Sequence, residues 1–574
     1  MKHLLKQLKA YRKESILGPL FKLLEAGFEL LVPLLVAAMI DQGVKLGDKS
    51  VIVWMSLMMV GLGLIGLLCS VTAQYFAAKA AVGSTTRLRR ALFAHLQTLS
   101  YTELDTIGAS TMLTRLTSDM NQVQSGVNLT LRLALRSPFV VFGAMVMAFT
   151  IDVHAASVFA IVIPILFAVV FGVMIVCIPL YRKVQARLDR VLGMTRENLT
   201  GVRVLRAFGR EEEQKREFSA RNDALTKEQN HVGRISVLLN PVTYVIINLA
   251  IVALIRTGAL RVESGALSQG DVIALYNYMS QILVELIKLA NLVLNITRAV
   301  ACCNRIGAVL EIESSQRSPQ TEPETTADAP AIEFRRAGLR YAGAGGDALD
   351  GISFRAEKGQ TIGVIGGTGS GKTTLINLIP RFYDATEGSV LVDGVPVEQY
   401  PLESLRRRIG VVPQKAVLFH GTIRENLLWG DPDAGDGTLR EALRAAQAEE
   451  IVQGKEGGLD FEIEQGGRNL SGGQRQRLTI ARALVRKPEI LILDDSASAL
   501  DFATDAALRK ALRALPERPT VVIVSQRTSS IRHADQIIVL DNGHMVGLGT
   551  HEELLRTCEV YREIHESQYK KEER

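Results

Sequence analysis

Six long apolar segments constrain the fold of this 574-residue chain more than any other feature. They lie at about 15–40, 51–78, 128–150, 156–180, 236–258 and 270–300. As α-helices that rise about 1.5 Å per residue, these segments are long enough to cross roughly 30 Å of hydrocarbon. Almost all apolar runs of this length precede residue 300, so the chain is predicted to join a helical membrane domain to a soluble domain.

The connections between these segments alternate in length. Those near 41–50, 151–155 and 259–269 are short, whereas those at about 79–127 and 181–235 are long, polar and helical in pattern. The second long loop is rich in Arg and Lys, and basic loops stay on the cytoplasmic side of a membrane. We therefore expect the long loops and both termini to be cytoplasmic, with helices that continue well beyond the bilayer.

Composition excludes some classes of function. The net charge of +6 fits a membrane protein with basic loops, whereas a nucleic-acid binder would carry a concentrated basic patch. The five cysteines are scattered, without a CxxC motif, and predict neither a disulfide framework nor a metal-thiolate site.

The chain changes character after the last apolar segment. Residues 313–330 are polar, contain proline and lack periodicity, which is typical of a linker. Short β-branched runs then alternate with helical stretches, the pattern of a parallel sheet in an α/β domain. The predicted fold is an all-α six-helix transmembrane domain at 1–312, the linker at 313–330, and an α/β domain at 331–574.

A glycine-rich motif predicts a phosphate site. GGTGSGKTT follows the apolar run TIGVI and precedes a helical stretch, as the pattern G-x-x-x-x-G-K-[ST] requires. Its backbone amides can wrap phosphates, Lys372 can reach the β- and γ-phosphates, and Thr373 can bind Mg2+. The predicted ATP-binding residues of this motif are Gly366, Gly367, Thr368, Gly369, Ser370, Gly371, Lys372, Thr373 and Thr374. Residues 331–574 are therefore predicted to form an α/β P-loop nucleotide-binding domain.

The segment EILILDDSASALD places two acids at the end of a predicted buried strand. Asp494 is the natural residue to hold the Mg2+ of a bound nucleotide. In a nucleotide hydrolase the next acid positions or deprotonates the attacking water, and a glutamate usually does this. Here that position is Asp495, one methylene shorter.

A second glycine motif, LSGGQ, lies upstream of this strand. Together with GGTGSGKTT and ILILDD in this order, it makes the chain resemble the ATP-binding cassette family. Six spans fused to one cassette resemble an exporter half-transporter of that family. The resemblance implies two cassettes stacked head to tail, with each ATP between one chain's P-loop and the other chain's signature motif, which is here Leu470, Ser471, Gly472, Gly473 and Gln474.

The resemblance also assigns three further residues. Tyr341 in LRYAG resembles the aromatic that stacks on adenine, although an exposed turn tyrosine would look the same. Gln414 in GVVPQ resembles the glutamine that approaches Mg2+ and contacts the transmembrane loops. Asp501 in SALD resembles the aspartate that communicates across the cassette dimer.

Two positions depart from the family pattern. Asp495 stands where the family has Glu, and Gln526 stands where it has a switch His. Retracting a carboxylate by about 1.5 Å, one C–C bond, spoils its hydrogen-bond reach to the attacking water. Glutamine can donate a hydrogen bond, but it can neither become cationic nor accept a transferred proton. The site is therefore expected to bind ATP and to hydrolyse it slowly.

Both departures beside an intact LSGGQ favour a heterodimer. A second, different half-transporter would supply the consensus Glu and His, and this chain's LSGGQ would complete the partner's site. A slow homodimeric exporter and an ATP-gated channel or regulator are the alternatives. An importer is disfavoured, because its cassette is usually a separate chain.

Other features concern coupling and cargo. The loop segment 197–212 resembles the second coupling loop of exporters, whose short helix docks into a cassette, typically the partner's. Glu29 is a candidate cavity residue, and Glu285 can pair with Lys288 three residues on. The predicted setting is a lipid bilayer, the bacterial inner membrane, with a small amphipathic cargo such as a drug.

Overall fold

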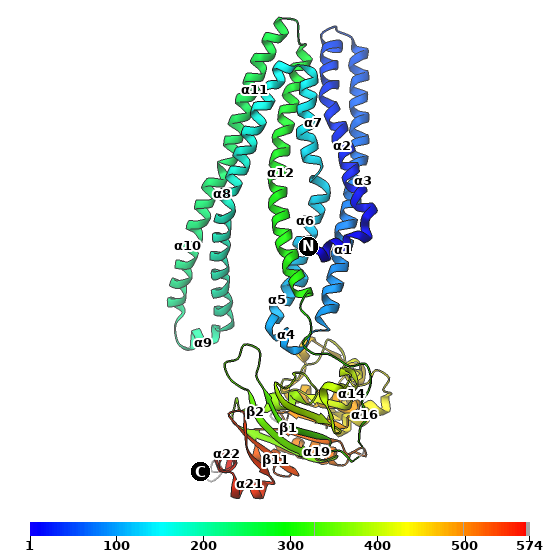
Figure 1. The fold of residues 1–574 in the computed structure, drawn as a ribbon, viewed down its shortest axis with the longest axis vertical. Helices are drawn as coiled ribbons and strands as arrows, with labels where there is room; N and C mark the ends of the chain where they lie inside the picture. Colours follow the sequence, from blue (N-terminus) through cyan, green and yellow to red (C-terminus); the bar gives the residue numbers. More distant parts are fainter. Residues whose placement is uncertain (327, 497–498, 570–574) are drawn as a thin grey trace. The chain divides into compact units, whose positions relative to one another are not determined.

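The computed structural model describes residues 1–326, 328–496 and 499–569 (Figure 1). Ala327 of the linker, Ala497 and Ser498 of the acidic segment, and residues 570–574 lie outside the described residues. The chain folds into two compact units. The helical unit comprises Met1–Gln97 and Ser110–Ile312, and the sheet unit comprises Thr98–Ala109 and Glu313–Arg574.

The described part of the helical unit contains six helical segments long and apolar enough to cross a membrane. They are Lys2–Val44, Lys49–Leu96, Ala109–Ile151, Val153–Thr200, Glu211–Glu263 and Gln269–Leu310. All six predicted spans lie within them, and each segment has 42 to 53 residues, far more than the roughly 20 that cross the hydrocarbon. The prediction of six helices that outrun the bilayer is confirmed.

The helical unit comprises α-helices with short 3-10 and π-helical turns between some of them. The α-helices are α1 (Lys2–Leu8), α2 (Arg12–Ala38), α3 (Lys49–Leu96), α5 (Ala109–Thr114), α6 (Met120–Leu133), α7 (Arg136–Ile151), α8 (Val153–Thr200), α9 (Val202–Ala207), α10 (Glu211–Val237), α11 (Leu239–Glu263) and α12 (Gln269–Leu310).

Small residues let these helices pack closely. A Cβ added to Gly126 of α6 would lie 2.2 Å from the Cβ of Ala299 in α12. One added to Gly143 of α7 would lie 2.5 Å from a methyl of Leu30 in α2. Lipid tails are as apolar as leucine, so membrane helices associate through such close van der Waals contact.

Charged side chains meet inside the helical unit. Arg136 donates hydrogen bonds to Glu285 and Glu29, both at 2.5 Å. Ser137 and Lys288 also donate to Glu285, at 2.9 and 2.7 Å. The expected Glu285–Lys288 pair is therefore present. Glu29, expected to face a cavity, is partly exposed but is paired with Arg136, a partner that sequence reasoning missed.

Removing the buried cation of this network should be costly. The side chains of Arg136 and Glu285 are only 8% and 4% exposed, whereas Lys288 is 43% exposed. Arg136→Met leaves Glu285 without its buried partner and should destabilise the protein by about 3 kcal/mol. Lys288→Met should cost less than about 1 kcal/mol. Thermal unfolding of both variants in detergent measures the difference, and equal losses would contradict it.

The sheet unit contains two main sheets. One is six-stranded with the order β12-β11-β3-β10-β9-β6, and the other is four-stranded and antiparallel with the order β2-β1-β4-β5. In the larger sheet β11, β3, β10, β9 and β6 run parallel. The strands are β1 (Ile332–Leu339), β2 (Leu349–Ala356), β3 (Thr361–Gly366), β4 (Glu387–Val392), β5 (Val395–Pro396), β6 (Ile409–Val412), β7 (Gly421–Thr422), β8 (Glu462–Ile463), β9 (Ile490–Asp494), β10 (Thr520–Val524), β11 (Gln536–Asp541) and β12 (His544–Gly549).

Helices surround these sheets. They are α4 (Tyr101–Ile107), α13 (Lys372–Leu378), α14 (Leu402–Arg408), α15 (Ile423–Leu428), α16 (Asp436–Ala445), α17 (Glu449–Gln453), α18 (Gly472–Val485), α19 (Phe502–Arg513), α20 (Thr528–Ile531), α21 (His551–Thr557) and α22 (Glu559–Tyr569). The predicted α/β P-loop fold of this part of the chain is confirmed.

The central strands are buried on both faces. In β9, Ile490 and Ile492 pack into the hydrophobic cluster shared with β1 and β2, while Leu491 and Leu493 pack into the cluster shared with α18. Parallel strands covered on both faces read as unbroken apolar runs, which explains ILIL in the sequence. The run ends at Asp494, where the strand reaches the edge of the sheet.

Candidate functional site

The parallel strands bring the predicted site residues to one edge of the sheet. Strands β3, β10, β9 and β6 end at Gly366, Val524, Asp494 and Val412. The P-loop, Gln526, Asp495 and Gln414 each follow one of these ends within a few residues. Ligands of open α/β sheets bind outside the carboxyl ends of the strands, so this edge is the candidate nucleotide site.

The P-loop needs its glycines for two different reasons. Gly369 and Gly371 have φ of 82° and 97°, a left-handed conformation that a side chain would strain. Gly366 needs space, because an added Cβ would lie 2.1 Å from the backbone oxygen of Leu540. These three positions therefore favour glycine over any residue with a side chain.

Lys372 lies over this loop. Its Nζ donates to the carbonyl oxygens of Gly366 and Gly367 at 2.9 and 2.6 Å. Burial lowers the pKa of this ammonium from its ordinary value, and the nearby Asp495 and Asp494 oppose that shift. The Lys372 ammonium group therefore lies at the loop, where it can contact a bound phosphate.

A pocket of about 470 Å³ opens beside the loop. Tyr341 lines it, and its hydroxyl donates to Thr374 Oγ1 at 3.1 Å. The structure therefore brings the tyrosine predicted to stack on adenine to the P-loop. The other residues that line the pocket are Asp347, Ala348, Gly369, Ser370, Gly371, Lys372, Thr373, Asn542 and Gly543.

Oxygen ligands suited to Mg2+ lie together at the same edge. Thr373 Oγ1 is 3.2 Å from Asp494 Oδ2, and the side chain of Asp494 is largely buried. Burial raises the pKa of Asp494, and the charge of Asp495 adds to that rise. Mg2+ is usually held by one or two carboxylates together with substrate phosphates, so a hydroxyl and a carboxylate at this spacing fit it.

Asp495 has an unusual backbone and a close polar neighbour. Its φ is 44°, in the left-handed region that Asp tolerates better than most residues. Gln414 Nε2 donates to Asp495 Oδ2 at 3.4 Å, so the two predicted site residues face each other. Burial raises the pKa of Asp495, while Gln414 and the nearby Arg527 and Lys372 oppose that shift.

Gln526 follows β10 and is exposed. Strand pairing places Val524 opposite Asp494 in the neighbouring strand. Ser525 and Gln526 therefore emerge at the same edge as Asp494 and Asp495.

The signature motif begins a helix. Ser471 is the N-cap of α18: its Oγ accepts from the backbone N of Gln474 at 3.2 Å, and Gln474 Oε1 accepts from the backbone N of Ser471 at 3.0 Å. This reciprocal pair is a capping box, which the spacing S-x-x-Q could have predicted. Leu470 is buried at 5% exposure, whereas Ser471 and Gly472 are exposed.

Asp501 is likewise a helix cap. It accepts from the backbone N and the hydroxyl of Thr504 at 2.8 and 2.9 Å, at the start of α19. These hydrogen bonds lower the pKa of Asp501. Its carboxylate therefore stays ionised and exposed.

A segment from the first half of the chain belongs to the sheet unit. The ring of Tyr101 in α4 lies 4.9 Å from that of Phe382, and Tyr383 donates to Asp105 at 2.5 Å. Burial and this hydrogen bond raise the pKa of Tyr383.

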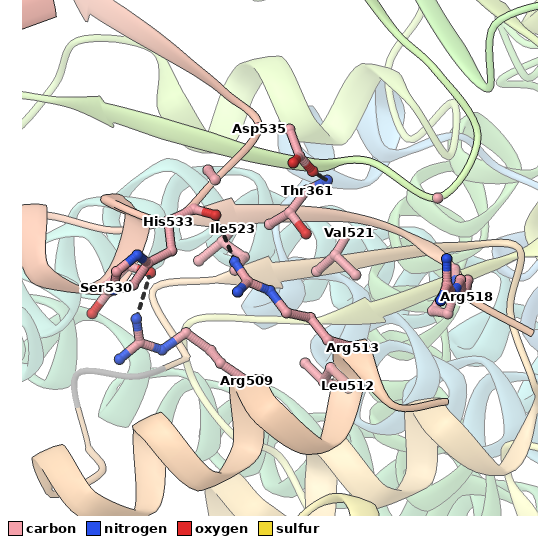
Figure 2. Close-up of a pocket in the computed structure, with 13 residues that line it drawn as sticks. Thr361, Arg509, Leu512, Arg513, Arg518, Val521, Ile523, Ser530, His533 and Asp535 are labelled. Atoms are coloured by element: carbon pink, nitrogen blue, oxygen red, sulfur yellow. Dashed lines mark hydrogen bonds between the residues drawn. The ribbon is translucent and has the colours of Figure 1, made fainter. Parts of the chain in front are cut away.

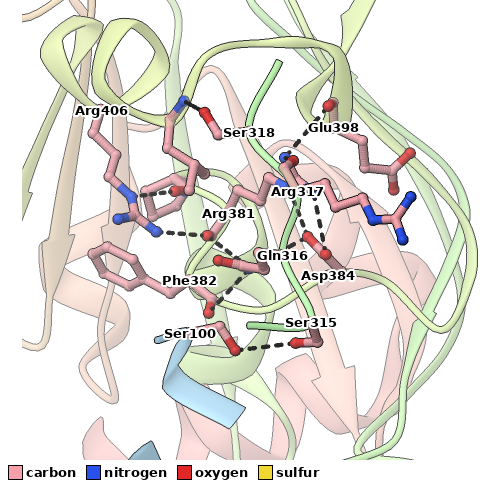
Figure 3. A network of polar contacts seen from close by, with 12 residues as sticks. Ser100, Ser315, Gln316, Arg317, Ser318, Arg381, Phe382, Asp384, Glu398 and Arg406 are labelled. Carbon is pink, nitrogen blue, oxygen red and sulfur yellow. Dashed lines mark hydrogen bonds and ion pairs between the residues drawn. The ribbon is translucent and has the colours of Figure 1, made fainter. Parts of the chain in front are cut away.

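The linker joins the same surface (Figure 3). Ser100 and Ser315 are hydrogen bonded at 3.1 Å. Gln316 donates to the carbonyl of Arg381 at 3.2 Å and to Asp384 at 3.3 Å. The beginning of the linker is thus packed on the sheet unit, and α4 is held beside it.

A P-loop ATPase fold on the same chain as the six membrane-length helices found among the described residues defines the class of ATP-driven membrane transporters. The chain belongs to the ATP-binding cassette (ABC) transporter family and has the half-transporter architecture of its exporters. Residues 15–286 match the family described as ABC transporter transmembrane region, and residues 349–498 match the family described as ABC transporter. The protein is therefore a multi-pass membrane protein with an ABC-type ATPase.

Known proteins agree with this assignment. An ABC transporter ATP-binding protein of Mycobacterium tuberculosis is 38% identical over 566 residues, which is 98% of this chain and 97% of the relative. A protein of Chromobacterium violaceum named ATP-dependent lipid A-core flippase is 30% identical. The match covers 99% of this chain and 97% of the flippase chain. A solved bacterial Atm1-family ABC exporter with ATP bound shares the fold, with a TM-score of 0.80 at 23% identity, covering 97% of this chain and 98% of that one.

Proposed function

We propose that this chain is the degenerate-site subunit of a heterodimeric ABC exporter. One observation carries the proposal: Asp495 and Gln526 replace the catalytic Glu and the switch His at the edge where the P-loop is complete. The intact LSGGQ beside them supports a role in a partner's site. In functional terms, residues 1–312 form the transmembrane domain, 313–330 the linker and 331–574 the cassette.

The chain's own site binds ATP. Tyr341 stacks on the adenine, residues 366–374 wrap the phosphates, and Lys372 exchanges its carbonyl partners for phosphate oxygens. Thr373 and Asp494 hold Mg2+, with Gln414 nearby. When bound, Mg2+ neutralises phosphate charge.

Hydrolysis at this site is slow for two reasons. The Asp495 carboxylate lies one bond short of the usual base and already accepts a hydrogen bond from Gln414 at 3.4 Å. A general base must reach the water at hydrogen-bond distance, which a retracted carboxylate does poorly. Gln526 offers the γ-phosphate a neutral hydrogen bond only, so neither residue can take up the water's proton efficiently.

The partner's site is the active one. There, Ser471, Gly472 and Gly473 of this chain approach the partner's ATP, and the N-terminus of α18 adds a favourable dipole. Asp501 communicates across the dimer. A different half-transporter with Glu and His then does most of the hydrolysis.

Two segments couple the cassettes to the membrane helices. Within the sheet unit, α4 is held by Phe382 and Tyr383. In the helical unit, α9 and its flanks expose Leu199, Val204 and Phe208, which fit docking into the partner's cassette. ATP binding closes the two cassettes against each other, and the cavity between the membrane helices then opens outward. ATP hydrolysis returns the transporter to its starting state.

The cargo is a small amphipathic molecule that is released away from the cytoplasm of a bacterial cell. The Chromobacterium relative is named a lipid A-core flippase, and this name supports a cargo that reaches the protein from the bilayer. Both termini and the cassette are cytoplasmic in this proposal, and no nucleic acid takes part.

Transport in vesicles tests this function. Inside-out membrane vesicles that contain this chain and its partner should accumulate lipophilic cationic dyes or fluorescent phospholipids with MgATP and not with MgADP. The physical reason is that only ATP can close and reset the cassettes. ATP-dependent ion conductance without accumulation of any probe would favour a channel or regulator.

A further inference from the structure

The segment that carries Gln526 is held by the C-terminal helix α22. Gln568 Nε2 donates to the carbonyl oxygen of Gln526 at 2.7 Å. Gln568 Oε1 accepts from both the backbone N and the hydroxyl of Thr528, each at 2.9 Å. One side-chain amide therefore uses its donor on Gln526 and its acceptor on Thr528, the two residues on either side of Arg527.

The chain that follows this segment is fixed from α19. Arg509 donates to the carbonyl oxygens of Ser529 and Ser530 at 3.1 and 3.3 Å, and Arg513 donates to that of His533 at 2.5 Å. These arginines line a pocket of about 420 Å³, and Figure 2 shows the contact of Arg509 with Ser530 and that of Arg513 with His533. The pocket lies at the amino ends of β3 and β10, near Thr361 and Val521, and not at the P-loop edge.

Helix α22 is itself anchored to the rest of the sheet unit. Tyr561 is fully buried, and its hydroxyl is hydrogen bonded to His551 Nδ1 at 2.7 Å. His565 lies one turn before Gln568 and contacts Thr528 Oγ1 at 3.3 Å. The exposed side chain of Gln526 is thus attached to a backbone that contacts from α19 and α22 hold in place.

We propose that Gln568 is a positioning residue for nucleotide binding: it sets the backbone of Gln526–Thr528 and thereby aims Gln526 at the γ-phosphate. The inference rests on the proposed role of Gln526 and extends it to a residue that no motif marks. The amide of Gln568 supplies both a donor and an acceptor, whereas ionised Glu lacks the donor and Met offers only a weak sulfur acceptor.

The test compares nucleotides with and without a γ-phosphate. The full-length chain is purified, and dissociation constants are measured for the Mg2+ complexes of ADP and of the non-hydrolysable imido analogue of ATP. Gln568→Met keeps the length of the side chain and removes both hydrogen-bonding ends. It should weaken binding of the ATP analogue about threefold to tenfold and that of ADP by less than about twofold.

Three further variants make the result decisive. Ser567→Ala, on the preceding residue, loses only a hydrogen bond within α22 and should leave both constants unchanged. Gln526→Ala should lower the preference for the ATP analogue, and adding Gln568→Met to it should lower that preference no further. Equal loss of both nucleotides in Gln568→Met, or additive losses in the double variant, would overturn the positioning role.

The same data separate this inference from the proposed function. If Gln526→Ala lowers the preference and Gln568→Met does not, only the positioning role is wrong. If Gln526→Ala leaves the preference intact, the role of Gln526 fails and the positioning role fails with it.

Discussion

Purified alone, the chain should hydrolyse MgATP about 100-fold more slowly than it does when co-expressed with a half-transporter that carries Glu and His at the corresponding positions. Asp495 is too short and Gln526 cannot accept a proton, whereas the partner's site receives an intact LSGGQ from this chain. Steady-state phosphate release from the two preparations measures the ratio. The neighbouring open reading frame is the first candidate for the partner, since such halves are commonly encoded side by side.

A gain of function provides the control for this experiment. The double variant Asp495→Glu/Gln526→His restores both consensus groups to the chain and should raise the turnover of the lone protein. It excludes misfolding as the reason for the low activity of the natural chain. Robust hydrolysis by the unaltered lone chain would instead overturn the degenerate-site proposal.

The second prediction concerns the asymmetry of the two sites in the complex. Ser471→Asp keeps an N-cap for α18 but brings a negative charge to the partner's phosphates, so it should reduce turnover at least about 50-fold. Asp495→Asn removes a group that contributes little and should change turnover less than about twofold. ATPase rates of the purified complexes measure both effects.

The choice of Asp at position 471 matters for interpretation. Ser471→Ala would also remove the hydrogen bond from the backbone N of Gln474, and losing an N-cap costs about 1 kcal/mol of helix stability. Unchanged melting temperatures of Ser471→Asp and Asp495→Asn therefore have to accompany the rates. Equal and near-total losses in the two variants would show that the site of Asp495 is catalytically important.

Local patterns explain what could be predicted from the sequence. The spans are long enough to be recognised by hydropathy, and GGTGSGKTT requires a strand–loop–helix context that TIGVI and the following stretch supplied. The parallel strands then bring Asp494, Gln414 and Gln526 to one edge, because residues that follow strand ends share that edge. The capping role of Ser471 was also readable from spacing, but it was overlooked.

Long-range contacts explain what could not be predicted. Tyr383 bonds Asp105 across 278 residues of chain, and Arg136 bonds Glu285 across 149. Such partners lie on different elements, and no periodicity within one element reveals them. Gln568 is another example, because a single glutamine on a short amphipathic helix carries no motif.

The membership of Thr98–Ala109 in the sheet unit has a mechanical consequence. The chain passes between the two units at Gln97–Thr98, at Ala109–Ser110 and again at Ile312–Glu313, so three peptide bonds tie them together. Because these three ties are covalent, the two units stay joined at all three crossings whenever one of them moves against the other.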